Sequence, residues 1–105
     1  METPTPSYVV ECYWPTVSEH EAKAALAGIA WSQAGVSPTD RVWPLGCILV
    51  PSDGLALFLI AGPSAEVIRK VGEVVQLPFD RIVESISIAA AITPTLSVQN
   101  LNEER

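Results

Sequence analysis

The sequence predicts a single small α+β domain whose strands and helices follow the order βαββαβ. Its 105 residues leave room for one hydrophobic core. The composition, 49% apolar and 17% charged residues, is sufficient to fill that core. Runs rich in β-branched and aromatic residues alternate with two helix-like stretches, and Gly or Pro residues separate them.

The first strand and the first helix are indicated by residue type. Residues 8–14 are rich in aromatic and β-branched side chains and end before Pro15, which predicts a strand. Ser18 and Glu21 form the pattern of a capping box, in which the hydroxyl and the carboxylate satisfy free backbone N–H groups. An alanine-rich helix follows and is expected to end at Gly35.

The middle of the chain predicts an antiparallel hairpin. Two strands, residues 41–50 and 55–61, flank a turn with Asp53 and Gly54 at its tip. Pro44 lacks an N–H for the hydrogen-bond ladder, so the earlier strand is expected at a sheet edge. Residues 55–61 are apolar on both faces, which favours a central position.

A second helix and a last strand complete the order. The helix begins at residues 62–64 and is expected to pair Glu66 with Lys70 on its polar face. Its apolar face holds Val67, Ile68, Val71, Val74 and Val75. Residues 77–80 break this helix, and residues 81–92 are predicted as the last strand, with Ile82, Ile86 and Ile88 on one side.

These elements predict the ferredoxin-like split βαβ fold. Two helices cover one face of a four-stranded antiparallel sheet and leave the other face bare. We expect residues 1–6 to be a flexible N-terminal segment, residues 7–92 the domain and residues 93–105 a C-terminal tail. A homodimer packed sheet to sheet, like a dimeric α+β barrel, would bury the bare face, and a monomer covered by its own tail is the alternative.

Charge and composition exclude several classes of function. The net charge is −6 and there is no basic stripe, so nucleic acid is not an expected partner. Residues 55–61 are the longest strongly apolar stretch, too short to span a membrane. Without an export signal, Cys12 and Cys47 are expected as reduced thiols, and the protein as cytoplasmic. The sequence contains no known catalytic motif.

Four residues are candidates for chemistry. Strand parity places Glu84 with the isoleucines of the last strand, and a carboxylate on an apolar face needs a partner. Glu11 lies in the first strand, adjacent to the last strand in this fold, and whether the two carboxylates share a face stays open. His20 is expected to be solvated. Cys47 is expected to be more accessible than Cys12, which shares its side of the strand with apolar residues.

Two segments resemble the DUF4242 family of small bacterial proteins. They are residues 61–69, Ala-Gly-Pro-Ser-Ala-Glu-Val-Ile-Arg, and residues 76–82, Gln-Leu-Pro-Phe-Asp-Arg-Ile, accompanied by Glu11 and Glu84. That family includes a nickel-binding, ferredoxin-like dimer, so the resemblance implies a dimer and metal-binding roles for the two carboxylates. Members of the family often carry His-Ser where this chain has Gly46-Cys47. The imidazole, which nickel prefers, is therefore replaced by Gly46, and Cys47 offers a softer ligand.

Three functions follow as hypotheses. The first is a non-catalytic protein that binds a divalent metal, nickel by family resemblance, through Glu11, Glu84 and His20 or Cys47 of either subunit. The second is a small-ligand binding protein or enzyme that uses the apolar sheet face as a cavity. The aromatic residue expected to line that cavity is Tyr13, Trp14 or Trp43. The third is an adaptor that recognises another protein through the strand containing Pro44 or through residues 96–101.

Overall fold

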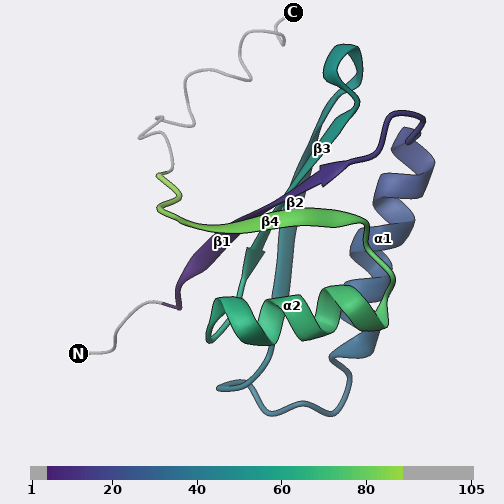
Figure 1. Ribbon diagram of the computed structural model, residues 1–105. Coiled ribbons are helices and arrows are strands. Elements are labelled where there is room, and N and C mark those ends of the chain that lie inside the picture. The colour runs from purple at the N-terminus through teal and green to yellow at the C-terminus, as the bar shows by residue number, and fades with distance from the viewer. Residues whose placement is uncertain (1–4, 89–105) are drawn as a thin grey trace, which may run out of the picture.

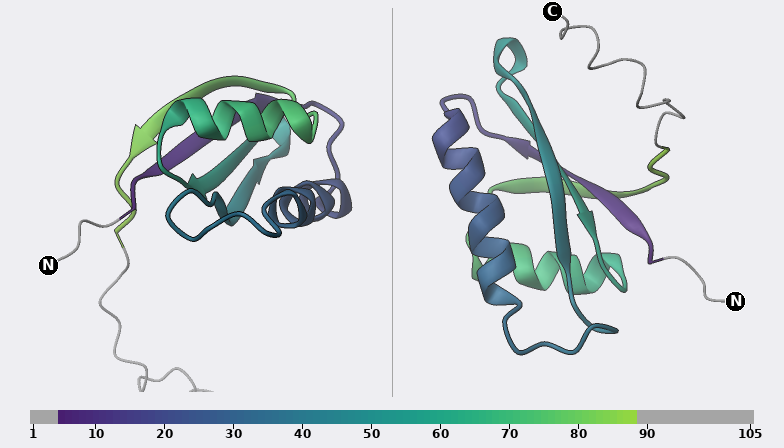
Figure 2. Two further views of the ribbon diagram at one scale, coloured as in Figure 1. Left: turned by 90° about the horizontal axis from the view of Figure 1, so that it is seen from below. Right: turned by 180° about the vertical axis from the view of Figure 1, so that it is seen from behind.

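The computed structural model describes residues 5–88 and confirms the predicted order (Figure 1). The elements are β1 (Ser7–Tyr13), α1 (Glu19–Ser32), β2 (Trp43–Val50), the short 3₁₀ turn η1 (Pro51–Asp53), β3 (Leu55–Ala61), α2 (Ala65–Val74) and β4 (Phe79–Ser85). The four strands form one antiparallel sheet in the order β2-β3-β1-β4. This is the ferredoxin-like fold, and both helices lie on the same side of its sheet (Figure 2).

The β2–β3 hairpin has the predicted geometry and extends beyond the ends of β1 and β4 (Figure 1). β2 is an edge strand, as Pro44 requires, and β3 is central. Gly54 closes the turn with φ of 62°, a left-handed conformation that favours glycine. A Cβ at this position would lie 3.1 Å from Pro15 Cα, so the turn also needs a residue without a side chain.

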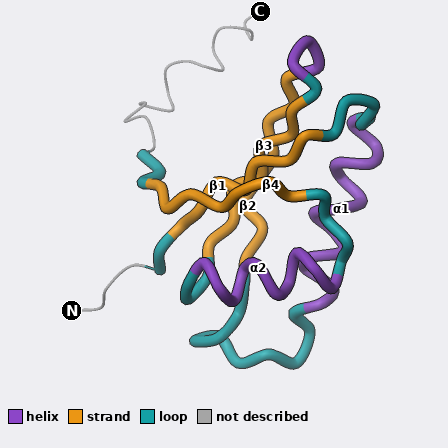
Figure 3. The backbone as a smooth tube through the Cα atoms, in the orientation of Figure 1, coloured by secondary structure: helices purple, strands orange, loops and turns teal. Residues whose placement is uncertain are grey.

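Side chains cap the start of both helices. The Glu21 N–H donates to Ser18 Oγ at 3.0 Å and the Ser18 N–H donates to Glu21 Oε1 at 2.8 Å, so the predicted capping box is confirmed. The helix ends at Ser32, three residues before Gly35, and the longest loop within residues 5–88 then leads to β2 (Figure 3). In α2 the Val67 N–H donates to Ser64 Oγ at 3.2 Å.

The polar face of α2 differs from the prediction. Glu66 Oε1 lies 3.8 Å from Arg69 Nε, one helical turn away, whereas the predicted partner was Lys70. Both side chains are largely exposed, so the pair contributes little to stability.

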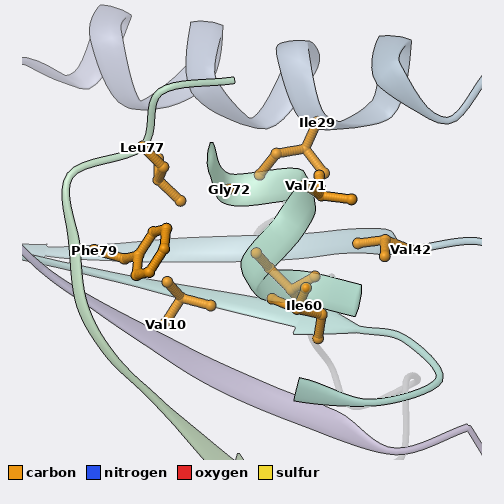
Figure 4. Close-up of a pocket in the computed structure, with 9 residues that line it drawn as sticks. Val10, Ile29, Val42, Ile60, Val71, Gly72, Leu77 and Phe79 are labelled. Carbon is orange, nitrogen blue, oxygen red and sulfur yellow. The ribbon is translucent and has the colours of Figure 1, made fainter. Parts of the chain in front are cut away.

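The core lies between the helices and the sheet face that they cover. Side chains from α1, α2, the loops and the sheet converge there, as Figure 4 shows for Ile29, Val71, Leu77, Val10 and Ile60. They enclose a void of only about 10 Å³, room for about one water molecule. Its lining is entirely apolar apart from backbone groups, so this void is a packing defect rather than a binding site.

The predicted last strand, residues 81–92, is wrong at both ends. β4 begins at Phe79 and ends at Ser85, because Ser85 pairs with Ser7, the first residue of β1, and no partner strand continues beyond it. Ile86 and Ile88, expected on an apolar strand face, are each 86% exposed. Residues 89–92, together with the tail proposed at residues 93–105, lie outside the described residues.

A bulge explains the early start of β4. The register of β1 against β4 shifts between Glu11 and Cys12. At this point the Tyr13 N–H donates to the Asp80 carboxylate at 2.6 Å, which satisfies a backbone group next to the bulge.

Substitution of Gly72 tests how tightly α2 packs against Phe79. A Cβ there would lie 2.9 Å from Phe79 Cε2, whereas a Cβ at Gly28 of α1 would have no heavy atom within 4 Å. We expect Gly72→Ala to lower the free energy of unfolding by about 1 kcal/mol or more through overpacking. The matched Gly28→Ala should raise the free energy of unfolding by up to about 1 kcal/mol through helix propensity. Urea unfolding measures both, and equal effects of the two variants would contradict the packing described.

Candidate functional site

The sheet face turned away from the helices is the candidate functional surface, and we call it the open face. Its apolar centre follows from the register, in which Val9 pairs with Leu59 on one side and with Val83 on the other, and Ile48 pairs with Leu57. Residues one position along each strand, such as Val10 and Phe58, point into the core instead.

Large apolar side chains on the open face are in contact with solvent. Ile48 is 64% exposed, Tyr13 62% and Val83 36%. Leu57 and Leu59 between them are partly buried. A contiguous apolar surface of this kind marks a site where something else binds.

The open face contains a hollow of about 350 Å³, at the low end of the range for small-molecule sites. Its lining residues come from all four strands and from the two residues that follow β4. They are Val9, Gly46, Cys47, Ile48, Leu57, Phe58, Leu59, Ser85, Ile86 and Ser87. No carboxylate, imidazole, lysine or arginine is among these residues.

Gly46 makes the space for this hollow. It pairs with Leu59 on the open face, next to a register shift in β2. A Cβ built on Gly46 would meet no heavy atom within 4 Å, so only open space lies where a side chain would project. Glycine within a strand often marks a bulge or a close approach by another molecule.

One ion pair lies on the open face. Arg81 donates through Nε to Glu11 Oε1 at 2.9 Å and through Nη2 to Glu11 Oε2 at 3.1 Å. This hydrogen-bonded pairing lowers the pKa of Glu11 and raises the pKa of Arg81. Because both oxygens of the carboxylate are engaged, Glu11 is occupied as an acceptor within its own chain.

The structure separates the two predicted carboxylates. Glu84 pairs in register with Tyr8, whose side chain is buried on the helix side of the sheet, whereas Glu11 is on the open face. Glu84 therefore shares its side of the strand with Ile82, as expected, but it is exposed at the β4 edge and does not need a partner. Of the isoleucines that suggested an apolar face, Ile82 packs against the core, whereas Ile86 and Ile88 lie beyond the strand.

The other two candidates lie elsewhere. His20 is exposed in the first turn of α1. Cys47 is on β2, at the opposite edge of the sheet from Glu84. Among the residues that the structure describes, no three His, Cys, Asp or Glu side chains are grouped closely enough to hold a metal ion. The structure therefore does not bring the four candidates together within one chain, and nickel binding, including a site shared between two copies, stays a prediction.

The two thiols differ in accessibility, as expected. Cys12 is fully buried, and burial raises its pKa to about 12. Cys47 is partly buried, which also raises its pKa. Both are free thiols, and their chemistry at neutral pH is that of the protonated form.

The aromatic residues expected to line a cavity do not line the hollow. Tyr13 is at the far end of β1, opposite Leu55, and Trp43 lies under the Arg41 guanidinium with 5.0 Å between that group and the ring centroid. Trp14 packs against the core instead. The feature that the sequence analysis missed is Gly46, whose place in the middle of a strand was the available signal.

No family model, curated protein or solved structure matches the chain. The resemblance to the DUF4242 family therefore stays a prediction. None of the helices within residues 5–88 is long and apolar enough to cross a membrane.

Acidification tests the Glu11–Arg81 pair. Since the pKa of Glu11 in the folded chain lies below its ordinary value of 4.5, the pair stabilises the fold at higher pH. This contribution is lost as the pH falls below 4.5 through the folded-state pKa. We expect the melting temperature of Glu11→Gln to fall less than that of the wild type between about pH 6 and 3. Glu84→Gln, which leaves the pair intact, is the control and should lose as much melting temperature as the wild type. An equally large loss of melting temperature in Glu11→Gln would contradict the pairing.

Proposed function

We propose that this protein is a homodimeric small-molecule binding protein. Two copies pack through their open faces, and the hollow beside Gly46 holds an apolar ligand. The observation that carries the proposal is the apolar open face with a hollow, in which none of the described lining residues is charged.

The open face suits a second copy of the chain. A symmetric dimer brings the same surface together twice, so a face made of Val9, Ile48, Leu57 and Val83 meets an equally apolar surface. Burial of apolar area stabilises such contacts by about 25 cal/mol per Å². The only described ion pair on this face, Glu11 with Arg81, is already formed, so docking leaves neither charge unpaired.

The lining of the hollow favours binding over acid–base catalysis or metal coordination. Two serines, Ser85 and Ser87, are the polar residues of its described lining on this side, because Cys47 pairs with the buried Phe58 and its thiol points to the helix side of the sheet. General acid–base chemistry at neutral pH needs a group with a pKa near 7. Hard divalent metals prefer carboxylates, and nickel or zinc prefers imidazoles. The second copy covers the open side of the hollow and excludes water from it.

The experiment introduces a charge into the centre of the open face. We expect Ile48→Glu to convert the dimer to a monomer, because the new carboxylate would be buried against apolar side chains. Light scattering coupled to size-exclusion chromatography measures the mass. Fluorescence of the neutral dye Nile red measures binding in the hollow, which should also be lost because Ile48 lines it.

Val74→Glu is the matched control, since Val74 is 74% exposed on α2, which packs on the other side of the sheet. It should leave both mass and dye binding at wild-type values. A monomeric wild type, or an Ile48→Glu variant that remains dimeric, contradicts the proposal.

A further inference from the structure

We infer that the ligand of the hollow is a neutral apolar molecule with one oxygen function, an alcohol or a carbonyl, which hydrogen-bonds to the Ser85 hydroxyl. This inference rests on the proposed function and specifies the chemical class of its ligand. Three observations on the described residues support it.

The first observation is an unsatisfied hydroxyl in the wall of the hollow. Ser85 Oγ is shielded from solvent and has no hydrogen-bond partner within the described part of the chain. The neighbouring Ser7 hydroxyl donates to the Ser85 carbonyl at 3.1 Å rather than to its side chain. A buried hydroxyl without a partner is unfavourable, so a ligand oxygen at this point gains a bond that the free protein lacks.

The second observation is the lack of charged side chains among the described residues that line the hollow. None of the residues that line the hollow is Lys, Arg, His, Asp or Glu. Arg81, the cation of the open face, is held by Glu11 through two hydrogen bonds. A carboxylate or ammonium ligand would therefore lose its hydration without gaining an opposite charge, which selects for a neutral molecule.

The third observation concerns size and access. The hollow extends across the sheet from Ser85 to the empty space above Gly46, which fits an apolar body next to one polar group. Ile86 and Ser87 follow Ser85 beyond the end of β4, and both are exposed. Because the Ser85 hydroxyl is itself shielded from solvent, contact with a ligand oxygen requires its neighbours to move aside.

The experiment compares three probes that share a phenyl ring and a two-carbon chain: ethylbenzene, 2-phenylethanol and phenylacetate. Competition with Nile red on the full-length protein gives their affinities. In the wild type, ethylbenzene and 2-phenylethanol should compete, whereas phenylacetate should not. Ser85→Ala should weaken 2-phenylethanol by about three- to tenfold, the value of one neutral hydrogen bond, and leave ethylbenzene unchanged.

Two variants serve as controls. Ser52→Ala, which removes an exposed hydroxyl in η1 outside the hollow, should leave all affinities unchanged. Gly46→Val should abolish binding of both neutral probes, because its side chain fills the hollow without a clash and suits a strand. Melting temperatures confirm that each variant is folded, and Ser85→Ala should be at least as stable as the wild type because it removes an unpaired hydroxyl.

The outcomes separate the two proposals. If the neutral probes bind the wild type but 2-phenylethanol binds Ser85→Ala with the same affinity, the proposed ligand class is overturned. The hollow would then still be a binding site. Strong competition by phenylacetate also overturns the proposed ligand class. Failure of every probe to bind the wild-type dimer overturns the proposed ligand binding, and this inference with it.

Discussion

A β-sheet has two faces, and the two helices in the described part of the chain, α1 and α2, pack on the same one (Figure 2). On that side Phe58, Val10 and Ile60 are sealed beneath α1 and α2. On the other side Ile48, Leu57 and Val83 form an apolar surface that no described part of the chain covers. Because the fold places every sheet residue on one face or the other, this asymmetry leaves the apolar surface on which we propose that the ligand and the second copy bind.

Much of the fold was predictable because local chemistry determines it. The Ser18 capping box, the left-handed Gly54 turn and the missing N–H of Pro44 each act within a few residues. They fix the start of α1, the hairpin and the edge position of β2. The strand order then follows from the small number of ways in which such a βαββαβ chain packs.

The candidate site was less predictable because it depends on register between distant strands. The alternation of β4 alone placed Glu84 among three isoleucines, yet the pairing of Ser85 with Ser7 ends the strand before Ile86 and Ile88, and only Ile82 remains within it. The bulge after Glu11 similarly depends on β1 and β4 together. Gly46 was visible in the sequence, but a missing side chain forms a hollow only where neighbouring strands surround it.

The central claim is that the open face is buried between two copies around a neutral ligand. Native mass spectrometry of the untagged protein tests it most directly, with and without added nickel, cobalt and zinc. We predict a dimer whose mass increases when a neutral organic molecule such as 2-phenylethanol is added. Its mass should not change when the metals are added. A monomer, or a dimer that binds a stoichiometric metal and no organic molecule, would contradict the account.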